Sequence, residues 1–496
     1  MRRVEILIGI IAAILLVVVV LVVGISHFVM DPPDEPAYVL PSYEVTGMTG
    51  SEGDVCLVTF SEVAKVNTLV LEEELLPLPY GAEKPSRLGV FSFSLWYKDG
   101  EEYKHFYTQD FIHPYRYCSF PTVSTDEIKI CIDDSSGLDW KLTSVTPKFV
   151  EKTYKDGFEV AAYITLQSGY DIANYDANHF SIITTVYLSF LWFNEYGEVF
   201  MTDGEHGGVM VNGEEIVATV ISNIRAKARP DVKIIPVFIG RDHSGALSAA
   251  YVHSQGMGPH KETLASDIKA FIEKYDLDGA SFDYEYPDNS NDNKVYYEFC
   301  TYLRTVLGDD MFISGATCHW MFIPFNLMMQ AGKDVMTMDR LEIMSYDLRD
   351  AVGEDAYHST FQNGAYDQYV RFKALAEEGD DGYLLRGLVY GDQEAMVPLS
   401  KINLGLPFYS RPLTLDAYWG EYKYHAHKLG QFGNLTENNT YGHEYFNSWQ
   451  MIYDKTAYAI DQGFGGVMIW NYACDLPMNH ECSLFNAIAA AIESRK

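Results

Sequence analysis

The sequence predicts an α/β protein whose main domain is a (β/α)8 (TIM) barrel, with an N-terminal β-sandwich domain and an N-terminal transmembrane helix. Three observations predict this arrangement. An apolar run fills residues 6–23, a strand-rich segment fills residues 43–150, and strands alternate with helices from about residue 158 to residue 496. The composition provides for large cores, because 48% of the residues are hydrophobic and 14% are aromatic.

The N-terminal segment is expected to act as a membrane anchor. Residues 6–23 are almost free of polar side chains and are long enough to cross a bilayer. No small-residue cleavage site is evident in residues 24–36, which favours an uncleaved signal anchor over a cleaved signal peptide and secretion. Arg2 and Arg3 place the N-terminus in the cytoplasm. Residues 1–30 therefore predict a single-pass type II membrane protein with its body outside the cell or in a lumen.

A short stalk and a β-rich domain follow the anchor. Residues 31–42 are acidic and rich in proline, which is typical of an extended linker. In residues 43–150, apolar and polar side chains alternate, for example over 91–97 and 128–132, and a turn sequence follows at 98–101. Several short strands with no helical period predict a β-sandwich.

The barrel domain is predicted for residues 158–496. Its eight expected strands are residues 161–166, 182–193, 232–239, 277–287, 311–317, 341–346, 402–408 and 466–470. Apolar stripes at helical spacing lie between them, within 264–275 and 295–306, and a helix over 483–494 closes the chain. Residues 419–448 are expected to loop over the barrel mouth. Eight strands alternating with helices indicate a (β/α)8 barrel.

The fourth expected strand carries an unusual row of polar side chains. Because side chains alternate along a strand, Ser281, Asp283 and Glu285 are expected on one face, and Phe282, Tyr284 and Tyr286 on the other, against helices. Two carboxylates near the C-terminal end of a barrel strand lie where such barrels carry their chemistry. An acid beside an ionised neighbour is also what cleavage of a glycosidic bond needs. The plain alternative is a solvated acidic strand end.

These residues resemble the strand-four signature of the family 18 glycoside hydrolases, the chitinases and their relatives. That signature is Asp-Gly-x-Asp-x-Asp-x-Glu, often followed by Tyr-Pro. This chain matches it at Asp278, Gly279, Asp283, Glu285, Tyr286 and Pro287. Three later segments also resemble the family: strand six is matched by Met344–Asp347, strand seven by Lys401–Tyr409 and strand eight by Gly465–Trp470. Two positions depart from the pattern: Ser281 replaces the middle acid, and Phe238–Arg241 stands where the family has Ser-x-Gly-Gly.

The resemblance implies a retaining, substrate-assisted cleavage of β-1,4-linked N-acetylglucosamine, in which the 2-acetamido group of the sugar is the nucleophile. Glu285 would be the general acid and later the base. Asp283 would hold the acetamide N–H, and Tyr346 would donate to the acetamide oxygen. Asp347 would bind the sugar, and Trp470 would form the floor beneath it. Ser281 and Met344 belong to the same implied site, although Met344 by itself is typical of core packing.

Serine at position 281 predicts that the carboxyl groups of this site titrate differently from those of a site with a second acid there. Without a second carboxylate beside it, Asp283 is expected to ionise at lower pH than in a paired site and to stay ionised. Its charge would then help aromatic neighbours to hold Glu285 protonated.

Three other functions stay open from the sequence. Some endo-β-N-acetylglucosaminidases of the family, which cut within the chitobiose core of N-glycans, resemble this variant more than standard chitinases do. Chitinase-like lectins keep the barrel but usually lose the acid at the position of Glu285. A surface adhesin would use the sandwich as its binding part. Turnover of chitin oligomers and of a high-mannose glycopeptide would separate these functions.

The N-terminal β-rich segment loosely resembles discoidin-type, galactose-binding-like sandwiches. This resemblance rests on three segments, Thr59–Phe60, Val66–Leu71 and residues 128–137. Such domains often bind sugars, but others are spacers, so both roles stay open.

The charge of the chain restricts the classes of molecule it is expected to bind. The net charge of −33, from 69 acidic and 36 basic residues, argues against nucleic acid and an anionic membrane surface. It suits a neutral partner such as chitin or another N-acetylglucosamine-containing oligosaccharide. No metal or organic cofactor is implied.

The cysteines and two asparagines indicate possible modifications. In an oxidising compartment, Cys474–Cys482 and Cys118–Cys131 are candidate disulfides. Asn434 and Asn438 are candidate glycosylation sites.

Overall fold

The computed structural model describes most of the two folded regions of the chain. The described residues are 38–74, 89–110, 112, 115–135, 139–150, 153–166, 176–201, 213–242, 246–318, 337–347, 359, 399–412, 420–429, 439–442 and 444–496. None of the helices in these ranges is both long enough and apolar enough to cross a membrane. The expected anchor, most of the stalk, and Asn434 and Asn438 lie outside the described residues, so those expectations stay predictions.

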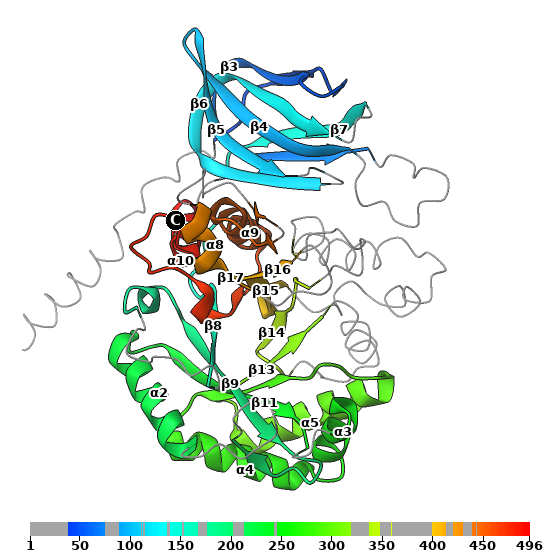
Figure 1. Cartoon of the computed structure of the whole chain (residues 1–496), viewed down its shortest axis with the longest axis vertical. Helices are drawn as coiled ribbons and strands as arrows, with labels where there is room; N and C mark the ends of the chain where they lie inside the picture. Colours follow the sequence, from blue (N-terminus) through cyan, green and yellow to red (C-terminus); the bar gives the residue numbers. More distant parts are fainter. Residues whose placement is uncertain are drawn as a thin grey trace, which may run out of the picture. The chain divides into compact units, whose positions relative to one another are not determined.

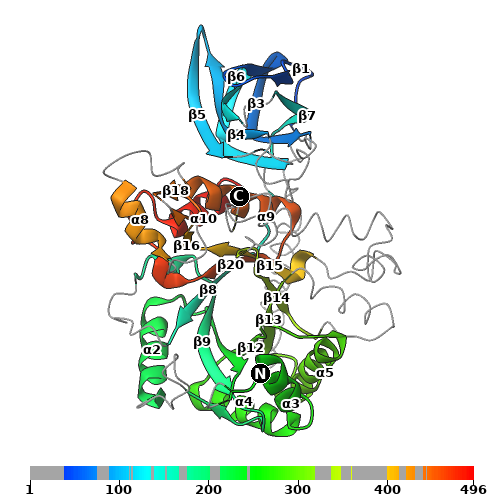
Figure 2. The same cartoon turned by 45° about the vertical axis from the view of Figure 1, so that its right-hand side comes forward.

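Eight parallel strands form a closed barrel (Figures 1 and 2). The sheet order is β9-β11-β12-β13-β14-β15-β20-β8, and β8 pairs with β9 to close it. The strands are β8 Glu159–Thr165, β9 Thr185–Phe193, β11 Lys233–Gly240, β12 Gly279–Asp283, β13 Phe312–Thr317, β14 Arg340–Ile343, β15 Ile402–Pro407 and β20 Gly466–Trp470. All eight predicted strands are thus confirmed. The two-residue β10, Val199–Phe200, adds an antiparallel pair to β9.

Helices cover the outside of the barrel strands (Figures 1 and 2). They are α2 Gly213–Lys227, α3 Ala249–Met257, α4 Lys261–Tyr275, α5 Ser290–Leu307, α9 Trp449–Gln462 and α10 Leu484–Glu493. The predicted apolar stripe of α4 is buried, for example at Leu264 and Ile268. The Asn289 side chain caps α5 by accepting from the backbone N–H groups of Asn291 and Asp292.

A small antiparallel sheet follows β15 along the chain. It contains β16 Tyr409–Pro412, β17 Gly420–Glu421, β18 Thr440–Tyr441 and β19 Glu444–Tyr445, with helix α8 Tyr422–Leu429 after β17. The prediction of a plain loop over residues 419–448 is therefore wrong for its described part. The short 3-10 helices are η2 His179–Ser181, η7 Leu399–Lys401 and η8 Tyr472–Cys474.

Seven antiparallel strands form the N-terminal region. They are β1 Tyr43–Thr46, β2 Thr49–Gly50, β3 Val55–Glu73, β4 Val90–Asp99, β5 Glu102–Asp110, β6 Tyr115–Ser135 and β7 Trp140–Lys148. Hydrogen bonds link all of them into one sheet, in the order β2-β7-β3-β6-β4-β5 with β1 on β3. The predicted two-sheet sandwich is not supported, because β3 and β6 run through the whole sheet with register shifts in their pairing. The likeness to galactose-binding domains stays a prediction.

Residues Ser42–Lys496 form one compact unit, and polar contacts join the N-terminal sheet to helix α9. Asp454 on α9 accepts from the Tyr107 hydroxyl at 2.6 Å and from the backbone N–H of Ser119 at 3.0 Å. The Arg116 guanidinium lies 3.6 Å from the same carboxylate. Arg495 donates to the Ser119 hydroxyl at 2.7 Å and pairs with Asp461 at 2.9 Å. The sheet is therefore fastened to the barrel through buried charge.

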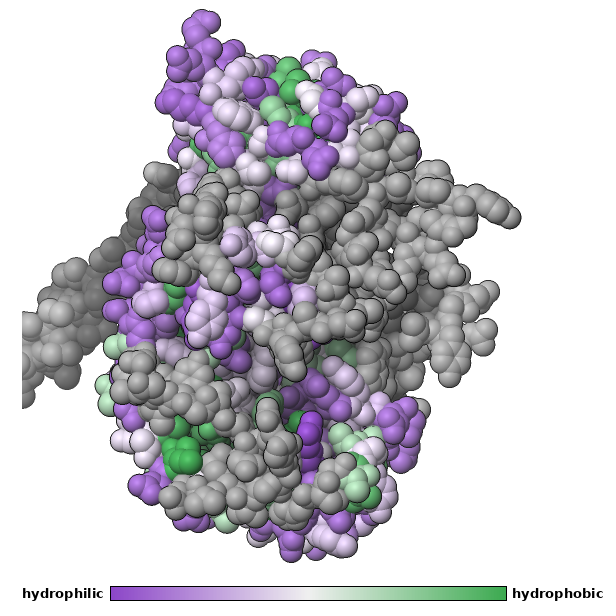
Figure 3. Space-filling model, viewed as in Figure 1, coloured by the Kyte–Doolittle hydropathy of each residue, from purple (hydrophilic) through white to green (hydrophobic). Residues whose placement is uncertain are grey.

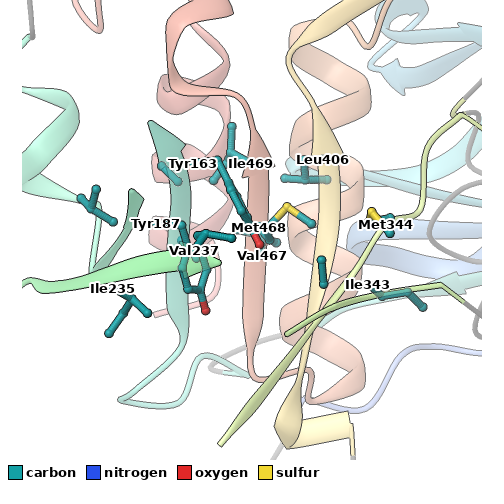
Figure 4. Packing of buried hydrophobic residues seen from close by; sticks show 14 of the residues in the cluster. Tyr163, Tyr187, Ile235, Val237, Ile343, Met344, Leu406, Val467, Met468 and Ile469 are labelled. Atoms are coloured by element: carbon teal, nitrogen blue, oxygen red, sulfur yellow. The ribbon is translucent and has the colours of Figure 1, made fainter. Parts of the chain in front are cut away.

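The barrel interior is filled by layers of buried side chains (Figure 4). Tyr163 and Tyr187, on neighbouring strands, have ring centroids 4.8 Å apart. Below them, Glu342 accepts from the Tyr187 hydroxyl at 2.5 Å and from the Asn403 amide at 3.1 Å. By contrast, the described part of the surface in Figure 3 is largely hydrophilic.

All seven cysteines are free thiols, so both candidate disulfides are wrong. Cys118 and Cys131 lie far apart on one extended strand, β6, beyond the reach of a disulfide. Cys474 instead directs its thiol toward the side-chain oxygen of Asn471, at 3.5 Å.

Candidate active site

The acidic strand β12 is held in the barrel by close backbone packing at its start. A Cβ atom at Gly279 would lie 1.9 Å from the Phe312 carbonyl oxygen, so only glycine fits beside β13. Asp278 accepts a hydrogen bond from the backbone N–H of Ile234 at 2.7 Å, which ties the start of β12 to β11. Both signature residues thus position the strand and lie away from its catalytic end.

The alternation predicted for β12 holds only as far as the strand itself. Phe282 and Tyr284 are buried outside the barrel as predicted, and the Tyr284 ring stacks on His253 of α3 at 3.8 Å between centroids. The strand ends at Asp283 instead of Pro287. Beyond it Tyr286 is 44% exposed and lines the same cavity as Asp283 and Glu285. Placing Tyr286 on the helix-facing side was therefore wrong, because strand alternation stops where the strand stops.

A cavity of about 480 Å³ lies at the C-terminal end of the barrel strands. Its walls include all the predicted site residues except the fully buried Ser281. The lining residues are Tyr163, Phe190, Ile239, Arg241, Asp283, Glu285, Tyr286, Ala316, Cys318, Met344, Tyr346, Asp347 and Trp470. Strands far apart in the sequence therefore bring the predicted residues together.

Asp283 is the more deeply enclosed of the two carboxyl groups. Burial, and then the charge of Glu285, raises the pKa of Asp283 well above its ordinary value, while Arg241 opposes the shift. One carboxyl oxygen, Oδ1, has no hydrogen-bond partner among the described residues. The direction of this shift is opposite to the expected easy ionisation of Asp283, because burial outweighs the relief gained from having serine at position 281.

Ser281 lies one layer below Asp283, inside the barrel. Its side chain is fully buried, and its hydroxyl has no hydrogen-bond partner within the described part of the chain. It therefore contributes no charge and no surface to the cavity, so its predicted contact with substrate is indirect.

Glu285 lies in the loop after β12, with its side chain exposed to the cavity. The enclosing walls, and then the charge of Asp347, raise its pKa, while Arg241 opposes the shift. A raised pKa is the property expected of a general acid. The predicted direction is thus confirmed, although Asp347, and not Asp283, is the leading charged neighbour.

Tyr346 and Asp347 follow β14, two strands along from β12, and line the same cavity. The Tyr346 side chain is 9% exposed, and its hydroxyl lies 3.6 Å from the Met468 sulfur. Asp347 adopts a positive φ of 58° and pairs with Arg411 of β16 at 3.0 Å. The left-handed backbone is uncommon for aspartate, and here it accompanies a carboxylate held by an arginine.

Trp470 and Met344 provide apolar wall. Trp470, at the end of β20, packs edge-on against Tyr163 with ring centroids 5.4 Å apart and lies 5.7 Å from Phe190. Met344 is 8% exposed and mainly packs in the core, as its residue type suggested, while also lining the cavity. An aromatic wall of this kind suits the apolar face of a sugar ring.

Sequence reasoning missed several of the lining residues. Tyr163 and Phe190 lie near the C-terminal ends of β8 and β9. Because barrels of this kind carry their active sites at these strand ends, that position in the sequence could have identified them. Arg241 was noted only as a departure from the family pattern. Among the described residues, no group of three or more His, Cys, Asp or Glu side chains is arranged to hold a metal ion.

The arrangement can protonate a leaving group and bind an amide. Glu285 supplies a proton from an exposed carboxyl with a raised pKa, and Asp283 and Tyr346 supply a buried carboxyl and a buried hydroxyl in the same cavity. These groups support acid–base chemistry at a bound amide-bearing substrate.

Comparison with known proteins identifies the same region. The family model for "Glycosyl hydrolases family 18" matches residues 159–475. An endochitinase of Manduca sexta is 25% identical over 205 residues, 38% of this chain and 34% of that protein. Chitinase A1 of Niallia circulans is 22% identical over 263 residues, 43% of this chain and 37% of that protein. The chain thus aligns with little more than a third of the length of these curated relatives.

Solved structures share the barrel fold. A GH18 chitinase from the chitin utilization locus of Flavobacterium johnsoniae has a TM-score of 0.51 at 22% identity, covering 68% of this chain and 94% of that one. A Group IV chitinase of Ostrinia furnacalis, in complex with allosamidin, has a TM-score of 0.52 at 15% identity, covering 68% and 100%. At such identities the likeness establishes the fold.

Proposed function

The chain belongs to glycosyl hydrolases family 18, and from this premise we propose that it is a chitinase-like glycosidase that cleaves β-1,4-linked N-acetylglucosamine with retention. The observation that carries the proposal is the placement of Glu285, whose pKa is raised, in one cavity with Asp283, Tyr346 and Asp347. These four side chains match the acid, the two amide contacts and the sugar contact that the chemistry requires.

The reaction proceeds in two steps. Glu285 gives its proton to the glycosidic oxygen while the acetamido oxygen of the substrate attacks the anomeric carbon, which expels the leaving sugar and forms an oxazolinium ion. The positive charge that develops on the substrate favours the ionised form of Asp283, which accepts the acetamide N–H and offsets that charge. Tyr346 donates to the acetamide oxygen. The ionised Glu285 then takes a proton from water, which attacks the anomeric carbon from the face that the leaving group left. The acetamido group is restored, and the configuration is retained.

The raised pKa values set the pH range of this reaction. Glu285 must start protonated, and burial and Asp347 extend its protonated form to higher pH. Activity is therefore expected to fall on the alkaline side as Glu285 loses its proton. The aromatic wall of Trp470 and Phe190 and the half-exposed Tyr286 offer stacking surface for the sugar.

Substitution of Glu285 tests the proposal. Glu285→Gln keeps the shape of the side chain but removes the transferable proton, so we expect kcat on chitin oligomers to fall by roughly 10³-fold or more with binding nearly unchanged. The matched control is Glu298→Gln, on the exposed face of α5, which should leave kcat unchanged. An unaltered rate in Glu285→Gln would refute the mechanism.

The same assay separates the other functions. Turnover of a high-mannose glycopeptide but not of chitin oligomers would identify an endo-β-N-acetylglucosaminidase. Oligosaccharide binding without turnover of either substrate by the wild type would identify a lectin. The presence of Glu285 in the cavity disfavours the lectin.

A further inference from the structure

Arg241 is a cation in the cavity that the proposed mechanism does not use. It follows the last residue of β11, and its backbone N–H donates to the Phe193 carbonyl at 3.0 Å, which fixes the start of its side chain. Its guanidinium carbon lies 5.3 Å from the ring centroid of the buried Trp192. The side chain is exposed to the cavity, and it is the one cationic member of the cavity lining that the structure describes.

Among the described residues, none takes up a hydrogen bond from the Arg241 side chain. A guanidinium has five N–H donors in a fixed fork, and among the described residues that of Arg241 makes no hydrogen bond and no ion pair. The nearby Arg411 differs, because its guanidinium pairs with Asp347 at 3.0 Å. In the described part of the chain, the cavity thus offers one guanidinium whose donors are available to a bound molecule.

The charge of Arg241 works against the proposed general acid. It lowers the pKa of both Asp283 and Glu285, opposing the burial that raises them. A substrate that carried a negative charge to Arg241 would neutralise this effect, and Glu285 would then hold its proton more firmly. Binding of an anionic group and protonation of the acid would therefore favour one another.

We propose that Arg241 selects an N-acetylhexosamine chain that bears an anionic substituent, a sulfate ester or a carboxylate, on a sugar bound in this cavity. The inference rests on the proposed function and names its substrate class. Both anions match the two parallel N–H groups of a guanidinium, and the Trp192 ring holds the guanidinium plane in place. The net charge of the chain makes a densely charged polymer unfavourable, so the substrate carries isolated anionic groups on an otherwise neutral chain.

The test compares matched substrates. Wild-type kcat/KM is measured on an N-acetylglucosamine oligomer, on its 6-O-sulfated form and on a form with a 3-O-lactyl carboxylate. At least one anionic form should be favoured about tenfold over the neutral oligomer at low ionic strength, and the preference should shrink with added salt. The favoured form identifies the substituent and its position.

Three variants assign the preference to the guanidinium. Arg241→Gln should bring the ratio of anionic to neutral kcat/KM to about one, and Arg241→Lys should keep part of the preference, because it keeps the charge but not the fork. The control Arg229→Gln alters an exposed arginine paired with Asp231 at 2.9 Å, before β11, and should change neither rate. Circular dichroism verifies that each variant is folded.

The outcomes separate the two proposals. No preference for either anionic form, or an equal loss on all substrates in Arg241→Gln, would overturn the role of Arg241 and assign it to balancing Asp283, with the proposed glycosidase intact. If no substrate is cleaved, calorimetry of oligomer binding tests the anion site by itself. Salt-sensitive binding of an anionic oligomer that Arg241→Gln abolishes would uphold the anion site while the glycosidase proposal fails, and equal binding of all three oligomers would overturn the anion site as well.

Discussion

At the scale of the residue, the most unusual group outside the cavity is Glu342, inside the barrel. Its side chain is fully buried, and burial, followed by the charge of Glu159, raises its pKa to about 8. The hydroxyl of Tyr187 and the amide of Asn403 bind one carboxyl oxygen, while the other has no partner among the described residues. At neutral pH the group is therefore mainly a neutral acid, as a buried carboxyl beside another carboxyl should be.

Glu342 predicts a dependence of stability on pH. The folded pKa of about 8 lies above the ordinary value of 4.5. Between these values the unfolded chain has released the proton and the folded chain has kept it, so the free energy of unfolding falls as pH rises. Glu342→Gln should remove this contribution and make the protein relatively more stable at pH 8 than at pH 5, compared with the wild type.

The measurement is urea unfolding of both proteins at pH 5 and pH 8. The control Glu298→Gln, on the surface, should follow the wild-type pH dependence. Parallel pH dependences for Glu342→Gln and wild type would show that Glu342 does not titrate in this range.

At the scale of the element, strand β12 depends on a single close approach. A methyl group at Gly279 would overlap the Phe312 carbonyl oxygen, so Gly279→Ala must push β12 away from β13. We expect a loss of roughly 2–4 kcal/mol in the free energy of unfolding, together with reduced activity because Asp283 ends the same strand.

The matched control is Gly53→Ala. Its Cβ would meet nothing within 4 Å, and it adds only the strain of a φ of 85°, about 1–2 kcal/mol, with no effect on activity. Chemical unfolding and an activity assay check both variants. Equal losses in the two variants, with full activity in each, would contradict the role assigned to Gly279.

The sequence was most informative about elements whose side chains have one clear environment. The strand Lys233–Gly240 is buried along nearly its whole length, so its apolar run could be recognised without further context. Tyr286 could not be placed, because its direction depends on where β12 ends, and hydrogen bonds to neighbouring strands decide that. Arg241 could be seen as a departure, but its approach to Trp192 arises from pairing between β9 and β11, which the sequence does not reveal.

At the scale of the whole molecule, the N-terminal sheet and the barrel share a buried charge cluster. Arg116 and Asp454 have side chains that are 2% and 0% exposed, and their closest charged atoms lie 3.6 Å apart. Breaking such a pair from one side leaves the other charge buried without its partner, which typically costs about 3–5 kcal/mol.

Asp454→Ala tests this coupling between the two regions. The free energy of unfolding should fall by about 3–5 kcal/mol, and proteolysis should begin to separate the N-terminal sheet from the barrel. Asp231→Ala removes an exposed pair with Arg229 and should cost at most about 1 kcal/mol. Thermal unfolding and limited proteolysis measure both effects, and a wild-type digestion pattern in Asp454→Ala would show that the cluster does not fasten the sheet.

The closure of the barrel sets the order of events during synthesis. Strand β8 pairs with β20, and Glu159 and Gly466 are partners although roughly 300 residues separate them along the chain. While the ribosome is still making those residues, the nascent chain presents β8 with one edge unpaired, as a template for pairing with other chains. Chaperones that shield exposed strand edges should therefore be needed until β20 has emerged, and ribosome-bound chains that stop before Gly466 should be the species most prone to aggregate.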